Sequence, residues 1–211
     1  MSAIVPAFLS ALLLAGAATP ASAQIFWKPA DYSGPAVTGM DETLGQPLPG
    51  ATAEEQRAAI AWSVRSGLNV AALQCGFAPT LRTLENYNGM LRNHTAELAS
   101  AFNTVSNYFK RVSKTPQLGQ KALDTYGTKT YSGYSAVAAQ LDFCQVAGRV
   151  GTGALFAPRG NFTAYALEKI RELRNGLVQK GEQQFHRPTP INVATPQLAD
   201  KCWKKKKYSC G

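Results

Sequence analysis

A repeat of leucine and valine with a period of seven residues constrains the fold of this chain most strongly. The side chain three places after each of the first four repeat positions is aromatic, small or histidine. A helix returns to the same face every seven residues, whereas a strand alternates faces every two, so the repeat predicts a helix. The first set is Leu84, Leu91, Leu98, Val105 and Val112, and the second set is Tyr87, His94, Ala101 and Tyr108.

The repeat predicts a single continuous helix of about 30 residues, which would be roughly 45 Å long. This helix begins near Leu81, and Pro116 closes it, because proline disrupts a helix interior. Its apolar seam is suited to left-handed packing against companion helices. We therefore expect a bundle in which other helices cover the seam.

A second helix is predicted over residues 53–75. Thr52 and Glu55 have the spacing of a capping box, in which each side chain bonds the backbone N–H of the other residue. The apolar residues that follow are three or four positions apart, as one helix face requires. Gly76 and Pro79 end this helix.

Weaker patterns follow. Residues 118–130 keep a helical spacing that two glycines and several threonines weaken. A clearer face runs over 137–148, and we interpret the glycine-rich GRVGTG at 148–153 as a loop between helices, since it matches no phosphate-binding motif. Asn161 is the expected N-cap of a last helix, which extends to about Gln184.

The predicted fold is therefore all-α, an up-and-down bundle of four or five helices over residues 52–185. An extended arm over 24–51 and a Pro-rich basic tail over 186–211 flank this bundle, because prolines and glycines interrupt any apolar period there. We also expect an aromatic-rich core made of Tyr87, Phe102, Tyr108, Phe109, Tyr126, Tyr131, Tyr134 and Tyr165.

Residues 1–23 predict export. They hold an apolar run that ends in small residues and contain no charged side chain, which is typical of a signal peptide cleaved before Gln24. An uncleaved membrane anchor is the alternative, although the run is short for a bilayer span. The mature chain keeps the full net charge of +9. We expect a soluble protein of the periplasm or the secreted space.

The four cysteines predict two disulfides, because an exported chain folds under oxidising conditions. We favour pairing Cys75 with Cys144 and Cys202 with Cys210, and the other pairings stay open. The first pair has an obstacle, since the first and third helices of a square bundle lie diagonally and a disulfide needs Cα atoms within about 7 Å. A zinc site is disfavoured, because the chain has no C-x-x-C motif.

His94 and Glu97 form an H-x-x-E pair, which is the sharpest indication of a metal site or an enzyme in the sequence. Residues three apart lie on adjoining turns of one helix face, where both side chains can reach one ion. The competing interpretation is a buried histidine hydrogen-bonded to a neighbour, since His94 occupies a seam position. A catalytic carboxylate pair leaves no spacing signature. The candidates by position are Glu85, Glu97, Asp142, Glu168 and Glu172, with Asp142 interpreted as exposed on the polar face.

The tail carries a dense group of cations. Lys201, Lys204, Lys205, Lys206 and Lys207 lie close together, and Trp203 and Tyr208 flank the run of four. Such a segment favours an anionic membrane surface or an acidic envelope polymer as partner, and the alternative is a solvated end that aids solubility. Nucleic acid is a poor partner for an exported chain. No cofactor is predicted.

Three functional hypotheses follow. In the first, the chain is a non-enzymatic binding protein whose basic C-terminal loop contacts an anionic envelope component. In the second, it is an envelope enzyme or metal-binding bundle centred on His94 and Glu97. In the third, it is a structural or assembly factor that pairs with another helix through an exposed part of the heptad seam.

Overall fold

The computed structural model describes residues 30–135 and 139–178, together with the backbone of two short strands near the C-terminus. The described part of the body is all-α, as predicted, but holds six α-helices in place of four or five. They are α1 (Ala53–Gln74), α2 (Thr83–Asn93), α3 (Thr95–Val112), α4 (Pro116–Ser132), α5 (Gln140–Phe156) and α6 (Phe162–Asn175), with the 3₁₀ helix η1 (Pro79–Leu81) before α2.

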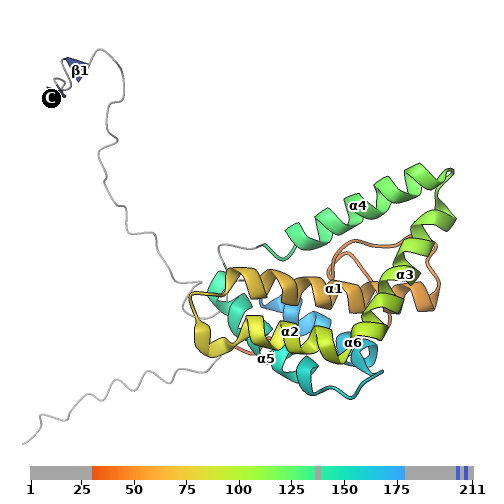
Figure 1. Cartoon of the computed structure of the whole chain (residues 1–211), viewed down its shortest axis with the longest axis horizontal. Coiled ribbons are helices and arrows are strands. Elements are labelled where there is room, and N and C mark those ends of the chain that lie inside the picture. The colour runs from red at the N-terminus through yellow and green to blue at the C-terminus, as the bar shows by residue number, and fades with distance from the viewer. Residues whose placement is uncertain (1–29, 136–138, 179–202, 205–206, 209–211) are drawn as a thin grey trace, which may run out of the picture.

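Helix α1 forms the centre of the bundle, and it contacts each of the other five α-helices (Figure 1). Its predicted start is confirmed: the Thr52 hydroxyl accepts a hydrogen bond from the Glu55 N–H at 3.2 Å, and the Glu55 carboxylate accepts one from the Thr52 N–H at 2.8 Å. Small residues such as Ala59 and Ala61, both fully buried, let the neighbouring helices approach on several sides.

The disulfide between Cys75 and Cys144 is present, with Cα atoms 5.6 Å apart. It joins the C-terminal end of α1 to the first turns of α5. The diagonal obstacle disappears because the central α1 contacts α5 directly. The second predicted pair, Cys202 with Cys210, lies outside the described residues.

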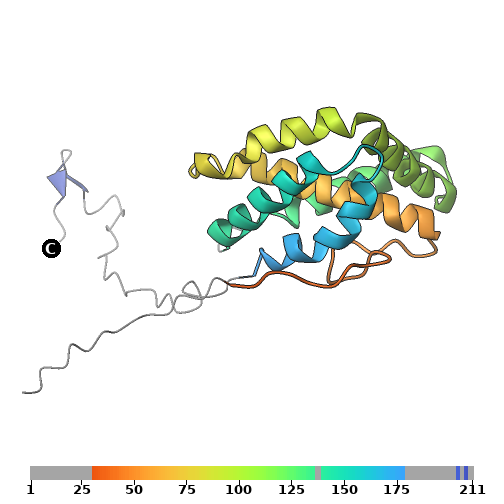
Figure 2. The same ribbon diagram turned by 90° about the horizontal axis from the view of Figure 1, so that it is seen from below.

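The described part of the arm, residues 30–51, contains no helix or strand and lies along α6 and α1 (Figure 2). The Val37 N–H donates to the Leu167 carbonyl of α6 at 2.9 Å, and the Asn175 side chain donates to the Tyr32 carbonyl at 2.9 Å. Leu44, which is 1% exposed, anchors the arm in the core. The predicted signal peptide lies outside the described residues.

The prediction of one continuous long helix is wrong, because the chain bends at His94 between α2 and α3. The Thr95 hydroxyl donates to the Leu91 carbonyl at 2.7 Å, so a side chain enters the backbone hydrogen-bond ladder at this point. Insertions of this kind bend helices. In Figures 1 and 2, α3 accordingly leaves the line of α2.

The bend changes how the heptad repeat is buried. All four residues of the second set, from Tyr87 to Tyr108, are buried. In the first set, Leu98 and Val105 are buried, whereas Leu84 is 51% exposed and Val112 is 47% exposed. The seam is therefore open to a partner helix at its two ends and, in part, at Leu91, which is half-buried.

The interpretation of residues 148–153 as a loop is also wrong, since α5 continues through all of its glycines. Packing explains them: a Cβ on Gly148 would lie 3.3 Å from Leu81, and one on Gly153 would lie 2.3 Å from the Tyr165 hydroxyl. The glycines thus let η1 and α6 approach α5 closely, which outweighs their low helix propensity.

The two remaining helices also differ from their predicted lengths. The ambiguous helix exists and is longer than expected, as α4. Helix α6 ends at Asn175, earlier than the predicted Gln184. At this end, the Asn175 side chain bonds the arm, and the next residue is Gly176, which has a low helix propensity. Most of the predicted aromatic core is confirmed, but Phe102 is 37% exposed.

Candidate functional site

His94 is buried at the bend between α2 and α3 and is 2% exposed. Its Nε2 donates to the Ala154 carbonyl of α5 at 2.9 Å, and its ring lies 5.2 Å from that of Phe162. Its Nδ1 lies 3.8 Å from a carboxylate oxygen of Glu97 and has no hydrogen-bond partner among the described residues. The interpretation of a buried histidine hydrogen-bonded to a neighbour is confirmed.

Glu97 caps the N-terminus of α6. Its carboxylate accepts hydrogen bonds from the backbone N–H groups of Phe162 at 3.0 Å and Thr163 at 2.7 Å. A carboxylate at a helix N-terminus satisfies free N–H groups and opposes the positive end of the helix dipole. The expected N-cap, Asn161, makes no side-chain hydrogen bond there. The role predicted for Asn161 is therefore filled by a residue far away in the sequence.

His94 and Glu97 thus lie together, as their spacing predicts, but both are engaged in contacts between helices. Within residues 30–135 and 139–178, no group of three or more His, Cys, Asp and Glu side chains could hold a metal ion. The pair therefore offers two potential ligands in the described part of the chain, fewer than a protein metal site generally uses.

The other candidate carboxylates have different surroundings. Asp142 is buried, contrary to its interpretation as an exposed residue, and Tyr32 of the arm forms a hydrogen bond with it. Burial raises the pKa of the neighbouring Tyr32 to about 12, and a hydrogen bond to Asp142 adds to this shift. Glu172 pairs with Lys169 at 3.1 Å and with Arg149 at 3.5 Å. Glu85 and Glu168 are exposed.

The basic tail contains a two-stranded antiparallel hairpin made of β1 (Trp203–Lys204) and β2 (Lys207–Tyr208). Its register places Trp203 opposite Tyr208 and Lys204 opposite Lys207. Lys201, Lys205 and Lys206 lie outside the described residues. The pairing brings the aromatic residues and lysines that flank the turn together along the backbone.

Two open grooves lie on the helical body, each with a volume of about 460 Å³. The first, here called the α1–α3 groove, is formed where α1, the end of α2 and the first half of α3 meet. Its walls include Trp62, Arg65, Leu91, Arg92, Leu98 and Phe102. The second, the α3–α4 groove, lies between α3, α4 and the arm, and its walls include Pro47, Tyr108, Phe109, Lys121, Tyr126 and Lys129.

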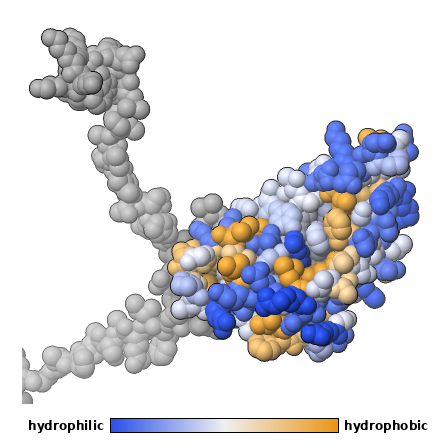
Figure 3. All heavy atoms as spheres, in the orientation of Figure 1, coloured by the Kyte–Doolittle hydropathy of each residue, from blue (hydrophilic) through white to orange (hydrophobic). Residues whose placement is uncertain are grey.

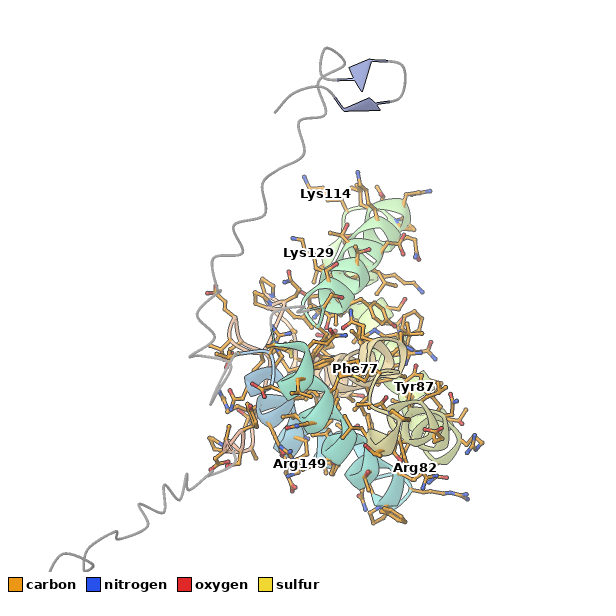
Figure 4. All side chains as sticks on the ribbon, turned by 90° about the vertical axis from the view of Figure 1, so that its left-hand side faces the viewer. Phe77, Arg82, Tyr87, Lys114, Lys129 and Arg149 are labelled. Carbon is orange, nitrogen blue, oxygen red and sulfur yellow. A yellow bond between two sulfur atoms is a disulfide. The ribbon has the colours of Figure 1, made fainter. Side chains whose placement is uncertain are left out.

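The two grooves differ in how their cations are held. Arg65 is half-buried, and its guanidinium lies 4.9 Å from the ring centroid of Trp62. Lys121 and Lys129 of the α3–α4 groove are exposed, and Figure 4 shows Lys129 pointing outward into solvent. Tyr126 contributes a buried hydroxyl with no partner among the described residues, and burial raises its pKa. The α1–α3 groove is therefore the one with an immobilised cation.

Sequence reasoning missed Trp62 and Arg65. A period of three or four residues marks the buried face of α1, and these two side chains lie beside that face. A periodic spacing of apolar residues identifies the buried face of a helix. It does not identify aromatic and cationic side chains that are only partly buried.

No described helix combines the length and hydrophobicity that a membrane span requires. Comparisons of the chain with protein-family models, with curated proteins and with solved structures found no match.

Proposed function

We propose that the chain is an exported, non-enzymatic binding protein that contacts an anionic membrane surface through its basic C-terminal hairpin. The observation that carries this proposal is the register of β1 and β2, which places Lys204 opposite Lys207 and Trp203 opposite Tyr208. Like charges at directly opposed positions destabilise a strand pair. An anionic surface would offset that repulsion.

The composition of the hairpin suits a membrane surface. Each lysine close to an anionic bilayer contributes on the order of 1 kcal/mol to binding, and tryptophan and tyrosine favour the interface between headgroups and acyl chains. A two-stranded hairpin is marginally stable alone. The predicted disulfide between Cys202 and Cys210 would brace it and reduce the cost of ordering on binding. In this proposal, the hairpin attaches the protein to the envelope, and the helical body serves as the scaffold that carries the hairpin.

The test is binding of the mature chain to vesicles of neutral lipid with and without an anionic lipid. Replacing the four lysines from Lys204 to Lys207 by serine should weaken binding to the anionic vesicles by about 4 kcal/mol, or roughly a thousandfold. Added salt should weaken binding of the unmodified chain, since surface charges are screened.

A matched control removes the same charge from the helical body. Lys110, Lys114, Lys121 and Lys129 are all exposed, and replacing them by serine also lowers the net charge from +9 to +5. This control should lose much less affinity than the hairpin variant. Equal losses of affinity in the two variants would mean that only the net charge of the chain matters. Unchanged binding of the hairpin variant would exclude the hairpin as the membrane contact. Binding to an anionic polymer such as polyphosphate, without binding to vesicles, would overturn the membrane proposal.

A further inference from the structure

The α1–α3 groove exposes apolar side chains that are not buried in the core. The rings of Trp62 and Phe102 lie 4.8 Å apart, and Phe102 is 37% exposed. Leu91 is half-buried, and Leu98 forms the base of the groove. In the face shown in Figure 3, hydrophobic residues interrupt the hydrophilic surface over α1, α2 and α3. Concave apolar surface of this size is typical of ligand sites.

Arg65 gives the groove a fixed positive charge. Its guanidinium lies 4.9 Å from the Trp62 ring centroid and 5.5 Å from that of Tyr87, and it donates a hydrogen bond to the Tyr131 hydroxyl. These contacts hold the side chain in place before any ligand arrives, so little entropy is lost when the guanidinium binds an anion.

The groove has no internal counter-charge. Its lining contains no carboxylate, and neither Arg65 nor Arg92 forms an ion pair with an acid among the described residues. Arg92, from the last turn of α2, is exposed at the edge of the groove. Guanidinium groups bind carboxylate and phosphate oxygens through paired hydrogen bonds. Two uncompensated arginines beside an apolar groove therefore match a ligand with an anionic head and an apolar body.

We propose that the α1–α3 groove binds a single-chain amphiphile with an anionic headgroup, of the class of medium- and long-chain fatty acids. The acyl chain lies against Trp62, Leu98 and Phe102, and the headgroup bonds Arg65 and Arg92. The volume of about 460 Å³ is within the range of small-molecule sites. This site is separate from the C-terminal hairpin, so it does not depend on the membrane proposal above.

The test is calorimetric titration of the mature chain with fatty-acid anions of increasing length, from octanoate to dodecanoate, below their micellar concentrations. Affinity should rise by about fourfold for each added methylene, because each buried methylene contributes a fixed hydrophobic term. Dodecyltrimethylammonium, which has the same tail and a cationic head, should bind at least tenfold more weakly than dodecanoate.

Two substitutions locate the site without removing a core contact. Ala99 is exposed and lines the groove, so Ala99→Trp should fill it and lower the affinity for dodecanoate more than tenfold. Arg92→Gln should lower affinity about tenfold through the lost charged hydrogen bond. Thermal unfolding curves would establish that both variants fold. The serine variant of the hairpin lysines should keep full affinity, which separates this proposal from the previous one.

A variant of the other groove provides the matched control. Lys121→Ser combined with Lys129→Ser should leave dodecanoate binding unchanged. Loss of affinity in this control, with unchanged affinity in Ala99→Trp, would place the ligand in the α3–α4 groove and overturn the proposal. Equal affinity for the anionic and cationic amphiphiles, or no binding of either, would also overturn it.

Discussion

The two ends of α5 are fixed to the rest of the molecule by different means. Near its first turn, Cys144 is covalently joined to Cys75 of α1. In its last turn, the Ala154 carbonyl accepts a hydrogen bond from His94, and Glu97 beside it caps α6. A cross-link acts mainly by restricting the unfolded chain, whereas a buried polar joint contributes only once its surroundings have formed. The N-terminal end of α5 is therefore tied to α1 in both the folded and the unfolded states of the oxidised chain, whereas its C-terminal end is held only in the folded state.

Removal of the disulfide should have the largest effect. The bond closes a loop with a sequence separation of 69 residues. The entropy lost by the unfolded chain for such a loop corresponds to about 4 kcal/mol, so Cys75→Ser with Cys144→Ser should lower the free energy of unfolding by about that amount. Guanidinium titrations of the oxidised protein and of the double serine variant measure this difference in the free energy of unfolding. A loss below about 1 kcal/mol would mean that the covalent end contributes no more than an ordinary contact.

His94→Ala should rank second, with a loss of about 3 kcal/mol in the free energy of unfolding, because it leaves a cavity against Phe162 and an unpaired carbonyl at Ala154. His94→Gln keeps a donor for that carbonyl and should lose less. If both variants are equally destabilised, packing alone holds this end and the hydrogen bond contributes nothing.

The smallest effect should come from the cap of α6. Glu97→Ala should cost about 1–2 kcal/mol, since two backbone N–H groups lose their acceptor. Asn161→Ala should cost less than about 0.5 kcal/mol, because this side chain makes no capping bond. Urea titration of the two variants side by side compares them. The reverse order would show that α6 is capped locally and that Glu97 does not join α3 to α6.

Local signals predicted much of the fold. The capping box of Thr52 and Glu55 set the start of α1, and apolar periodicity located most of the helices. The pairing favoured for the cysteines of the body, Cys75 with Cys144, was also correct. These features depend on neighbours in the sequence or on one simple rule of packing, so a pattern reveals them.

Most of the failures have one physical cause, which is contact with residues far away in the sequence. The bend at His94 depends on the Ala154 carbonyl and on Thr95, which a heptad pattern does not represent. The glycines of α5 resemble a loop until η1 and α6 are packed against them. At the candidate sites, the spacing of His94 and Glu97 correctly predicted proximity, but it could not predict that Glu97 caps α6. Trp62 and Arg65 left no pattern of this kind.

The glycines of α5 also limit how this protein can be stabilised. Replacing a helical glycine with alanine commonly favours the helix by about 1 kcal/mol. At Gly153, the added methyl group would collide with the Tyr165 hydroxyl, which donates to the Val150 carbonyl of the same helix at 2.7 Å. Alanine at this position would force the Tyr165 side chain out of its place, so a substitution that strengthens most helices would here disturb the contact between α5 and α6.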